Sequence, residues 1–429
     1  MLKLIIEKLI WLYILLLPLQ TVFIFDEKNI NGYKWQYGTG VFYATEILLV
    51  IIAILALIYL IKSKKIILSK FLDKNNLIKK TTIICLWLLI TWSGLSIFWS
   101  TEKSAAIYLW LKLLEGAALF LIIISLKIKQ NNLLWPLSFT AGVQGLLAAW
   151  QFITQSITEN KWLGIAAHEA SRLGEIVIEN SDGRWLRAYG TFSHPNILGG
   201  VCVCGLLASL KLSCSVKKQY QIILMIFAIT NILGIFFSFS RSAWLATIII
   251  LLIATIDNIK KRNYSTIKLI ITSCLIGSFL LVTFSNLIIA RNDFSNRLEK
   301  KSLNERKLQI IESLTIIKSS NWLGVGINNY TATLAMFNPQ LPAYLFQPVH
   351  NLYLLILSEL GIIGFLFFIA FLILFLIPII QEKNYNQLLW FIPLLIIGCF
   401  DHYFWTQYIG IILFWLILTN IKLNIKIFT

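Results

Sequence analysis

The sequence predicts an all-α polytopic membrane protein with about twelve transmembrane helices and both termini in the cytoplasm. Apolar residues make up 58% of the 429 residues and charged residues 13%, and the mean hydropathy is +0.77. A chain of this composition has too little polar surface to coat a soluble globule. Apolar runs of about twenty residues, the length of helix that crosses a bilayer, recur along the whole chain. We therefore expect one integral membrane domain over residues 1–429.

Twelve apolar runs are predicted to span the membrane. They cover residues 5–24, 41–61, 81–99, 105–126, 133–154, 195–212, 219–238, 242–256, 269–290, 352–380, 388–400 and 404–421. A helix over residues 350–380 would be about 46 Å long, more than one crossing needs. Gly361 and Gly364 offer a break between a short outer helix and the true span.

The positions of the lysines predict which turns lie inside the cell, because short cytoplasmic loops retain positive charge. With the N-terminus inside, the even-numbered turns receive Lys62, Lys64, Lys65, Lys70, Lys74, Lys79, Lys80, Lys127, Lys129, Lys211, Lys217, Lys218, Lys260, Lys261, Arg262 and Lys268. Two long loops, 155–194 and 291–351, then lie outside. The net charge of +17 mostly reflects this topology together with attraction to anionic lipid headgroups, and we expect no nucleic-acid partner.

Arginines are distributed differently from lysines. All of them except Arg262 map to the outer side, namely Arg172, Arg184, Arg187, Arg241, Arg291, Arg297 and Arg306. A guanidinium group presents a planar fork of donors that matches a phosphate or carboxylate, so outer arginines indicate an anionic ligand. Long outer loops also carry ordinary surface arginines. Sequence context favours Arg187, Arg241 and Arg306 as the ligand-binding ones.

His350 opens the tenth run, in "QPVHNLYLLILSELGIIG" (347–364). A plain membrane anchor would begin with lysine or tryptophan, whereas histidine and Asn351 offer hydrogen bonding and proton transfer. His350 is either an interfacial polar residue or a general base at the outer surface of the membrane, and its context favours the base. Glu359 lies nine residues further on, and an intramembrane carboxylate needs a polar partner, which we expect from a neighbouring span.

Other polar residues are secondary candidates or structural. His194 and Asn196 lie in "GTFSHPN", and Asp401 with His402 lies at a predicted outer turn, where the pair either lines the same cavity or caps helices. We expect no metal site.

Four further polar residues are predicted to be structural. They are His168, solvated in the first outer loop, Glu46 in the second run, and Lys112 and Glu115, three residues apart in the fourth.

Four motifs occur in order between the runs: "RAYGTFSHPNILGG" (187–200), "SFSRSAWLA" (238–246), "GVGINNY" (324–330) and "HNLYLLILSELGIIG" (350–364). Together they resemble the O-antigen ligase and O-antigen polymerase superfamily of membrane glycosyltransferases, over roughly residues 180–370. The resemblance implies a polyprenyl (undecaprenyl) diphosphate-linked glycan donor, no nucleotide, metal or other cofactor, and a site on the outer face of the bacterial cytoplasmic membrane. It makes His350 the catalytic histidine and Arg187, Arg241 and Arg306 the donor-binding arginines.

The expected activity is transfer of the glycan to an acceptor hydroxyl with inversion of configuration. Such a transfer needs a base for the hydroxyl proton and cations for the leaving diphosphate, and a histidine with arginines supplies both. Ligation, polymerisation and protein O-glycosylation share this donor chemistry, so the acceptor stays open among a glycolipid, a glycan and a protein. A transporter or flippase for lipid-linked glycans is the alternative of another class, although it should carry internal repeats that this sequence lacks.

Overall fold

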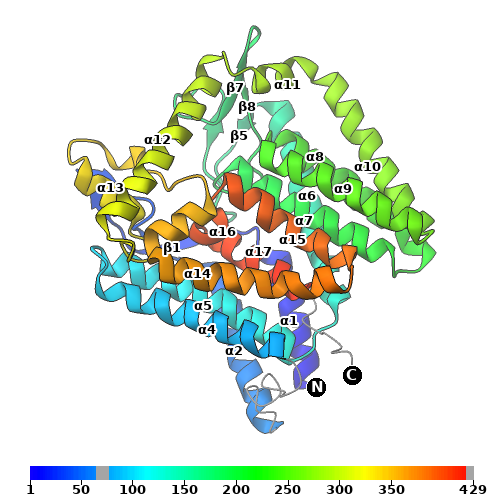
Figure 1. Cartoon of the computed structure of the whole chain (residues 1–429). Coiled ribbons are helices and arrows are strands. Elements are labelled where there is room, and N and C mark those ends of the chain that lie inside the picture. The colour runs from blue at the N-terminus through cyan, green and yellow to red at the C-terminus, as the bar shows by residue number, and fades with distance from the viewer. Residues whose placement is uncertain (64–76, 422–429) are drawn as a thin grey trace.

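The computed structural model describes residues 1–63 and 77–421, and its framework is helical (Figure 1). Among the described residues, nine helices are long and apolar enough to cross a membrane. They are α2 (Ala44–Lys62), α4 (Leu77–Leu95), α5 (Lys103–Ser125), α6 (Gln130–Thr154), α7 (Pro195–Ser213), α8 (Gln221–Phe237), α9 (Arg241–Lys260), α10 (Tyr264–Thr283) and α14 (Leu352–Gln381). The prediction of a polytopic helical membrane protein is confirmed.

Three shorter helices occupy the remaining predicted runs: α1 (Leu2–Leu16), α15 (Tyr385–Phe400) and α17 (Tyr408–Thr419). At 1.5 Å per residue, α17 is only about 18 Å long, less than the hydrocarbon thickness. All its residues from Tyr408 to Leu418 are buried, so protein rather than lipid surrounds it. Short helices are tolerated at membrane depth where neighbouring helices shield the backbone.

Three predicted runs differ from the helices. The twelfth, 404–421, is divided at Gln407 into α16 (Tyr403–Thr406) and α17. The first run, 5–24, leaves the helix at Leu16, because Pro18 lacks the N–H that would continue the helical hydrogen bonds, and the chain continues as strand β1 (Val22–Asp26). The ninth run, 269–290, ends α10 at Thr283 and resumes as the separate helix α11 (Ser285–Asn292). Lys64, Lys65, Lys70 and Lys74 of the first predicted inner turn lie outside the described residues, as does the side chain of Lys79.

The break predicted in the tenth run is confirmed at Gly361, whose backbone (φ 66°, ψ −170°) is not helical, whereas Gly364 continues the helix. The break frees carbonyl groups that other segments use. Val325 N–H donates to Ser358 O (3.0 Å) and Gly326 N–H to Glu359 O (2.8 Å). The "GVG" turn of the second outer loop is thereby fixed to the side of α14.

Intramembrane charges are paired, as predicted. Lys112 on α5 forms ion pairs with Glu115 of the same helix (3.4 Å) and with Glu46 of α2. Glu359 accepts a hydrogen bond from the indole N–H of Trp405 in α16 (Tyr403–Thr406) at 2.9 Å. Glu46 and Glu359 thus each find a donor on another helix, whereas Glu115 is paired within α5; burial in hydrocarbon requires such partners.

The outer loops contain strands, which the all-α prediction did not include. Four two-stranded antiparallel pairs form: β1 with β4 (Gly40–Tyr43), β2 (Asn29–Ile30) with β3 (Tyr33–Lys34), β5 (Ser156–Ile157) with β6 (His168–Glu169), and β7 (Val177–Asn180) with β8 (Gly183–Leu186). This folding of the first loop corrects the expectation for His168. Its ring is mostly buried, lies 2.7 Å from Glu175 Oε2 and stacks on Tyr189.

Candidate active site

The predicted site residues come together at one end of the helix bundle, which we call the outer side as the lysine distribution predicts. This end carries the β7–β8 hairpin, α11, α12 (Arg297–Ser319) and α13 (Tyr330–Phe337) (Figure 1). α12 contacts both α13 and α14. Segments from both long loops and from the α15–α16 turn therefore meet above the spans.

The backbone after the first loop is held by Gln151 of α6 and by Gln155, the C-cap of that helix. Gln151 accepts from Gly190 N–H (2.8 Å) and donates to Gly190 O (2.7 Å), while Gln155 Oε1 accepts from Leu186 N–H (2.6 Å). Arg187 lies between these two anchor points. Its position is consequently fixed by a spanning helix rather than by the loop that precedes it.

Arg187 is buried and committed to protein partners. Its Nε donates to Ser238 O and its Nη2 to Asn196 Oδ1, both at 2.7 Å. Asn196 Nδ2 in turn donates to Asp401 Oδ2 at 2.6 Å. Burial, reinforced by the charge of Arg291, lowers the pKa of Arg187 below its ordinary value. Three predicted residues thus form one continuous chain of hydrogen bonds.

Asp401 lies among three imidazoles, those of His350, His402 and His194. Burial would raise the pKa of its carboxyl, but the imidazoles and the Asn196 amide more than offset burial and hold that pKa below its ordinary value. Asp401 Oδ1 also accepts from the backbone N–H of His402 (2.9 Å). We conclude that Asp401 is an ionised carboxylate at the centre of the site.

The hydrogen bonds of His350 define its tautomer. Its Nδ1 lies 2.9 Å from Gln309 Oε1, which also accepts from the His350 backbone N–H (3.3 Å). An amide oxygen only accepts, so Nδ1 carries the proton and Nε2 presents a lone pair. Burial lowers the pKa of His350 below its ordinary value, an effect that Asp401 opposes and Arg306 strengthens. At neutral pH the imidazole is therefore uncharged and able to accept a proton.

The other two histidines are arranged differently. His194 caps α7, and its Nδ1 accepts from Asn196 N–H (3.0 Å), which leaves Nε2 as a donor. His402 is buried, with its ring 5.3 Å from the His350 ring and its Nδ1 2.7 Å from Thr406 Oγ1. Burial lowers the pKa of each to about 3. Of the three, His350 has the arrangement suited to a base.

A carboxylate bridges two arginines beside this histidine group. Glu299, in the first turn of α12, contacts Arg241 Nη1 with Oε2 (3.2 Å) and Arg291 Nη1 with Oε1. Arg241 Nη1 also donates to Arg291 O (3.3 Å). Glu299 is almost fully buried, whereas about a quarter of the Arg241 side chain stays exposed. The carboxylate therefore holds both guanidinium groups in place while an edge of Arg241 remains accessible.

Of the four arginines Arg187, Arg241, Arg291 and Arg306, the last has no hydrogen bond or ion pair to a described residue. It lies two turns after Glu299 on α12, hence on the same face, and is half-buried. Burial lowers its pKa, Asp401 raises it, and Arg291 lowers it further, which places these charges within range of one another. Its guanidinium group is free to bind an anion.

Asn351 has a structural role in this geometry. It is the N-cap of α14, where its side chain accepts from Leu354 N–H (2.9 Å), and its Nδ2 donates to Cys399 O (3.0 Å). These bonds fix the start of α14 directly after His350.

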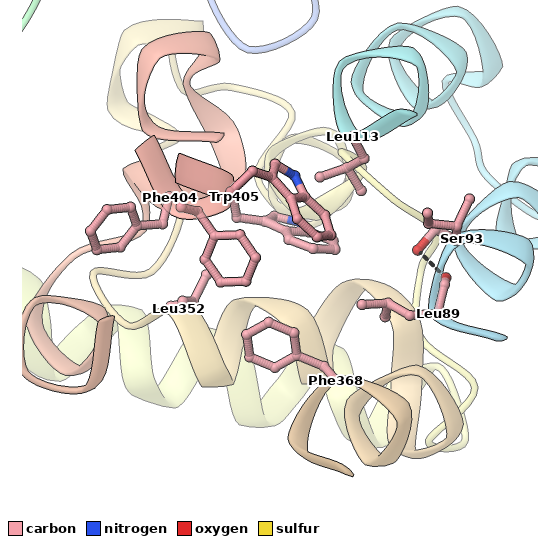
Figure 2. A pocket seen from close by; sticks show the side chains of 10 residues that line it. Leu89, Ser93, Leu113, Leu352, Phe368, Phe404 and Trp405 are labelled. Carbon is pink, nitrogen blue, oxygen red and sulfur yellow. Dashed lines mark hydrogen bonds between the residues drawn. The ribbon is translucent and has the colours of Figure 1, made fainter. Parts of the chain in front are cut away.

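An apolar cavity of about 20 Å³ lies beneath the site, among α4, α5, α14, α16 and α17 (Figure 2). Figure 2 shows Phe404 and Trp405 on one side of it and Phe368 on another, with the Ser93 hydroxyl bonded to Leu89 O (2.8 Å) of its own helix. A space of this size holds about one water molecule. Among the described residues that line it, the Trp415 indole N–H is an unpaired donor, which is fewer partners than an ordered water needs. We interpret it as a packing void.

Comparison with known proteins decides the family of the central part. Residues 226–369 match the family model described as O-antigen ligase. The chain contains an O-antigen ligase domain. No curated protein sequence matches the chain significantly.

The O-antigen ligase domain extends from within α8 to within α14 and contains Arg241, Arg306 and His350. The resemblance expected over residues 180–370 is confirmed for this part. Other contributors lie outside the matched range: Arg187, His194 and Asn196 before it, and Asp401 and His402 after it.

The sequence reasoning assigned no site role to three residues of the ligase domain: Arg291, Glu299 and Gln309. Arg291 was recognised only as an outer arginine. Glu299, Arg306 and Gln309 are spaced by seven and then three residues, which places them on one face of a helix. This spacing was the available signal.

Proposed function

We propose that the protein transfers a glycan from a polyprenyl diphosphate carrier to an acceptor hydroxyl at the outer face of the bacterial cytoplasmic membrane. The observation that carries the proposal is the His350 imidazole, with a free Nε2, beside a group of four arginines: Arg187, Arg241, Arg291 and Arg306. This combination supplies a base and a cationic site for a leaving diphosphate.

In the proposed step, the acceptor oxygen attacks the anomeric carbon of the donor and passes its proton to His350 Nε2. The bond from that carbon to the diphosphate oxygen breaks, and the electron pair leaves with the diphosphate. Attack from the side opposite the leaving group inverts the configuration. The neighbouring carboxylate of Asp401 stabilises the imidazolium that forms.

The charges of the site match this donor. Four guanidinium groups face two carboxylates, those of Glu299 and Asp401, which leaves two positive charges in excess. Each phosphate of a doubly esterified diphosphate keeps one acidic oxygen. Arg306 and the exposed edge of Arg241 contact the diphosphate in this proposal. Arg187, fully bonded to protein, contributes its charge and the position of Asn196.

Ligation, polymerisation and protein O-glycosylation differ in the acceptor that receives the glycan. Purified protein in nanodiscs should transfer glycan from an undecaprenyl-diphosphate oligosaccharide to one of three acceptors: a lipid A-core glycolipid, a second donor glycan, or a serine-containing peptide. Products are separated by mass spectrometry. Movement of the donor between leaflets without product would instead support the flippase alternative and overturn the enzyme proposal.

Gln309 is expected to set the pH dependence of this reaction as a positioning residue. Replacing it with glutamate places a negative charge beside Nδ1, which favours the imidazolium and raises the pKa of His350. Because the base works unprotonated, the acidic limb of the kcat profile should move to higher pH.

The matched control for this prediction is Gln309→Met, which removes the acceptor without adding charge. It should lower kcat without moving the acidic limb upward. An unchanged profile in the glutamate variant would show that His350 does not titrate in the rate-determining step.

The proposed topology has twelve spans, with α1, α15 and α17 added to the nine long helices, both termini inside, and residues 155–194 and 291–351 outside. In a background without native cysteines, membrane-impermeant maleimide should label cysteine at position 173 in intact cells and spare position 217. Leu173 and Lys217 are both exposed. Labelling of position 217 before lysis would contradict this orientation.

A further inference from the structure

α12 presents two different faces. Glu299, Gln309, Ser313, Ile316 and Ile317 are buried against the molecule. On the opposite face, the first two turns are polar, whereas the next two expose Leu308, Ile311 and Leu314, with exposed fractions of 58%, 60% and 47%. A row of exposed aliphatic side chains on an otherwise hydrophilic outer loop requires an explanation.

Hydrogen bonds fix the depth of this apolar row. At its upper end, Gln309 contacts His350, just outside the first turn of α14. At its lower end, Trp322 O, three residues after α12, accepts from Ile362 N–H (2.9 Å). Leu360, the last residue before the Gly361 break, lies about 12 Å along α14 from Leu352, and Ile362 follows the break. The second half of α12 therefore runs beside the first part of α14, toward the membrane interior.

A contact with α4 places Trp322 at the same depth. Trp92 Nε1 of α4 donates to Leu360 O (2.8 Å), directly beside the Gly361 break. Trp92 lies six residues, or about 9 Å, before Phe98, the end of that candidate span. The level reached by Trp322 is thus within the length of both α4 and α14.

The apolar row is also continuous with side chains that a membrane would cover. Trp322 and Leu323 are exposed, and so are Ile362, Ile363 and Leu366 at the start of the second part of α14. Glu312 borders the row and is only half-exposed, and Lys318 is long enough to extend its ammonium group toward the headgroups.

We propose that the second half of α12 is embedded in the outer leaflet, with Leu308, Ile311 and Leu314 in contact with acyl chains. Its first half, which carries Lys300, Lys301 and Lys307, remains among the headgroups. Interfacial helices insert their apolar face by roughly 5–10 Å. Because Arg306 and Gln309 face the other way, α12 forms the wall between the bilayer and the site. This surface assignment does not depend on the chemical activity.

Fluorescence quenching in nanodiscs tests the proposal. A single cysteine carrying bimane is placed at position 311, or at position 304, where Asn304 is exposed on the same face two turns earlier. Brominated acyl chains should quench the probe at 311 several-fold more than the probe at 304, and aqueous iodide should show the reverse order. Labelled variants are accepted only if they elute as the unlabelled protein does.

Three outcomes would overturn the proposal. Equal iodide quenching at both positions would place the row in water. Protection of position 311 from both quenchers would indicate a covering protein chain, either a partner or a second copy. Strong bromolipid quenching at 304 as well as 311 would mean that the whole of α12, not its second half, is embedded.

Discussion

Replacing His350 with alanine is expected to lower the rate of glycan transfer by about 10² to 10⁴ while leaving donor affinity nearly unchanged, because general base catalysis contributes about that much. Hydrogen bonds define the tautomers of His350 and His194, and of these two rings only that of His350 keeps a free lone pair, on Nε2. The measurement compares single-turnover transfer with the binding of the undecaprenyl-diphosphate oligosaccharide by isothermal titration calorimetry.

Two controls separate catalysis from folding in this experiment. His168→Ala removes a histidine of the first loop that lies away from this group, and its transfer rate should stay near that of the unmodified protein. His194→Ala should retain more activity than His350→Ala, since His194 caps α7 and its Nδ1 is already bonded. Retained turnover in His350→Ala would assign the base to another group, and a product of retained configuration would reject single-step displacement.

The pH dependence gives a further check on the same residue. Because burial lowers the pKa of His350 below its ordinary value, the base should stay unprotonated throughout the neutral range. The rate is therefore expected to fall only as the pH drops below that lowered pKa. A decline that begins above the ordinary histidine pKa of about 6.5 would point to another titrating group.

Replacing Arg306 with glutamine is expected to lower transfer by about 10² to 10³, the usual cost of removing one preorganised donor to a developing negative charge. Arg306 has no fixed partner among the described residues and faces Asp401 and His350 from α12, so its charge is available to the leaving diphosphate. The loss should fall mainly on kcat, because the diphosphate gains charge as the glycosidic bond breaks. Steady-state kinetics with varied donor concentration measures this.

Conservative and remote variants make the Arg306 experiment specific. Arg306→Lys keeps a point charge but loses the planar fork, so its activity should lie between those of the glutamine variant and the unmodified protein. Arg172→Gln removes an exposed outer arginine of the first loop and should have little effect. Equal activity of Arg306→Gln and Arg172→Gln would remove Arg306 from the diphosphate site.

The sequence by itself predicted the membrane class, the helical framework and most of the site. A spanning helix satisfies its backbone hydrogen bonds within itself, so twenty apolar residues suffice to specify it locally. The Gly361 break and the Lys112–Glu115 pair were equally local, being set by a single backbone position and by spacing along one helix. His350 and Arg306 were found because their residue types and motifs were unusual for the positions at which they occur.

Only the tertiary structure decided how these residues act. The proton of His350 is placed by Gln309, which lies 41 residues earlier in the sequence, and the two ends of the chain of bonds from Arg187 to Asp401 are even further apart. No periodic pattern encodes such pairings, because they arise when whole helices pack. The same holds for Glu299. In the sequence it is an ordinary carboxylate at a helix start, and it bridges Arg241 and Arg291 because the first turn of α12 meets the start of α9 and the end of α11.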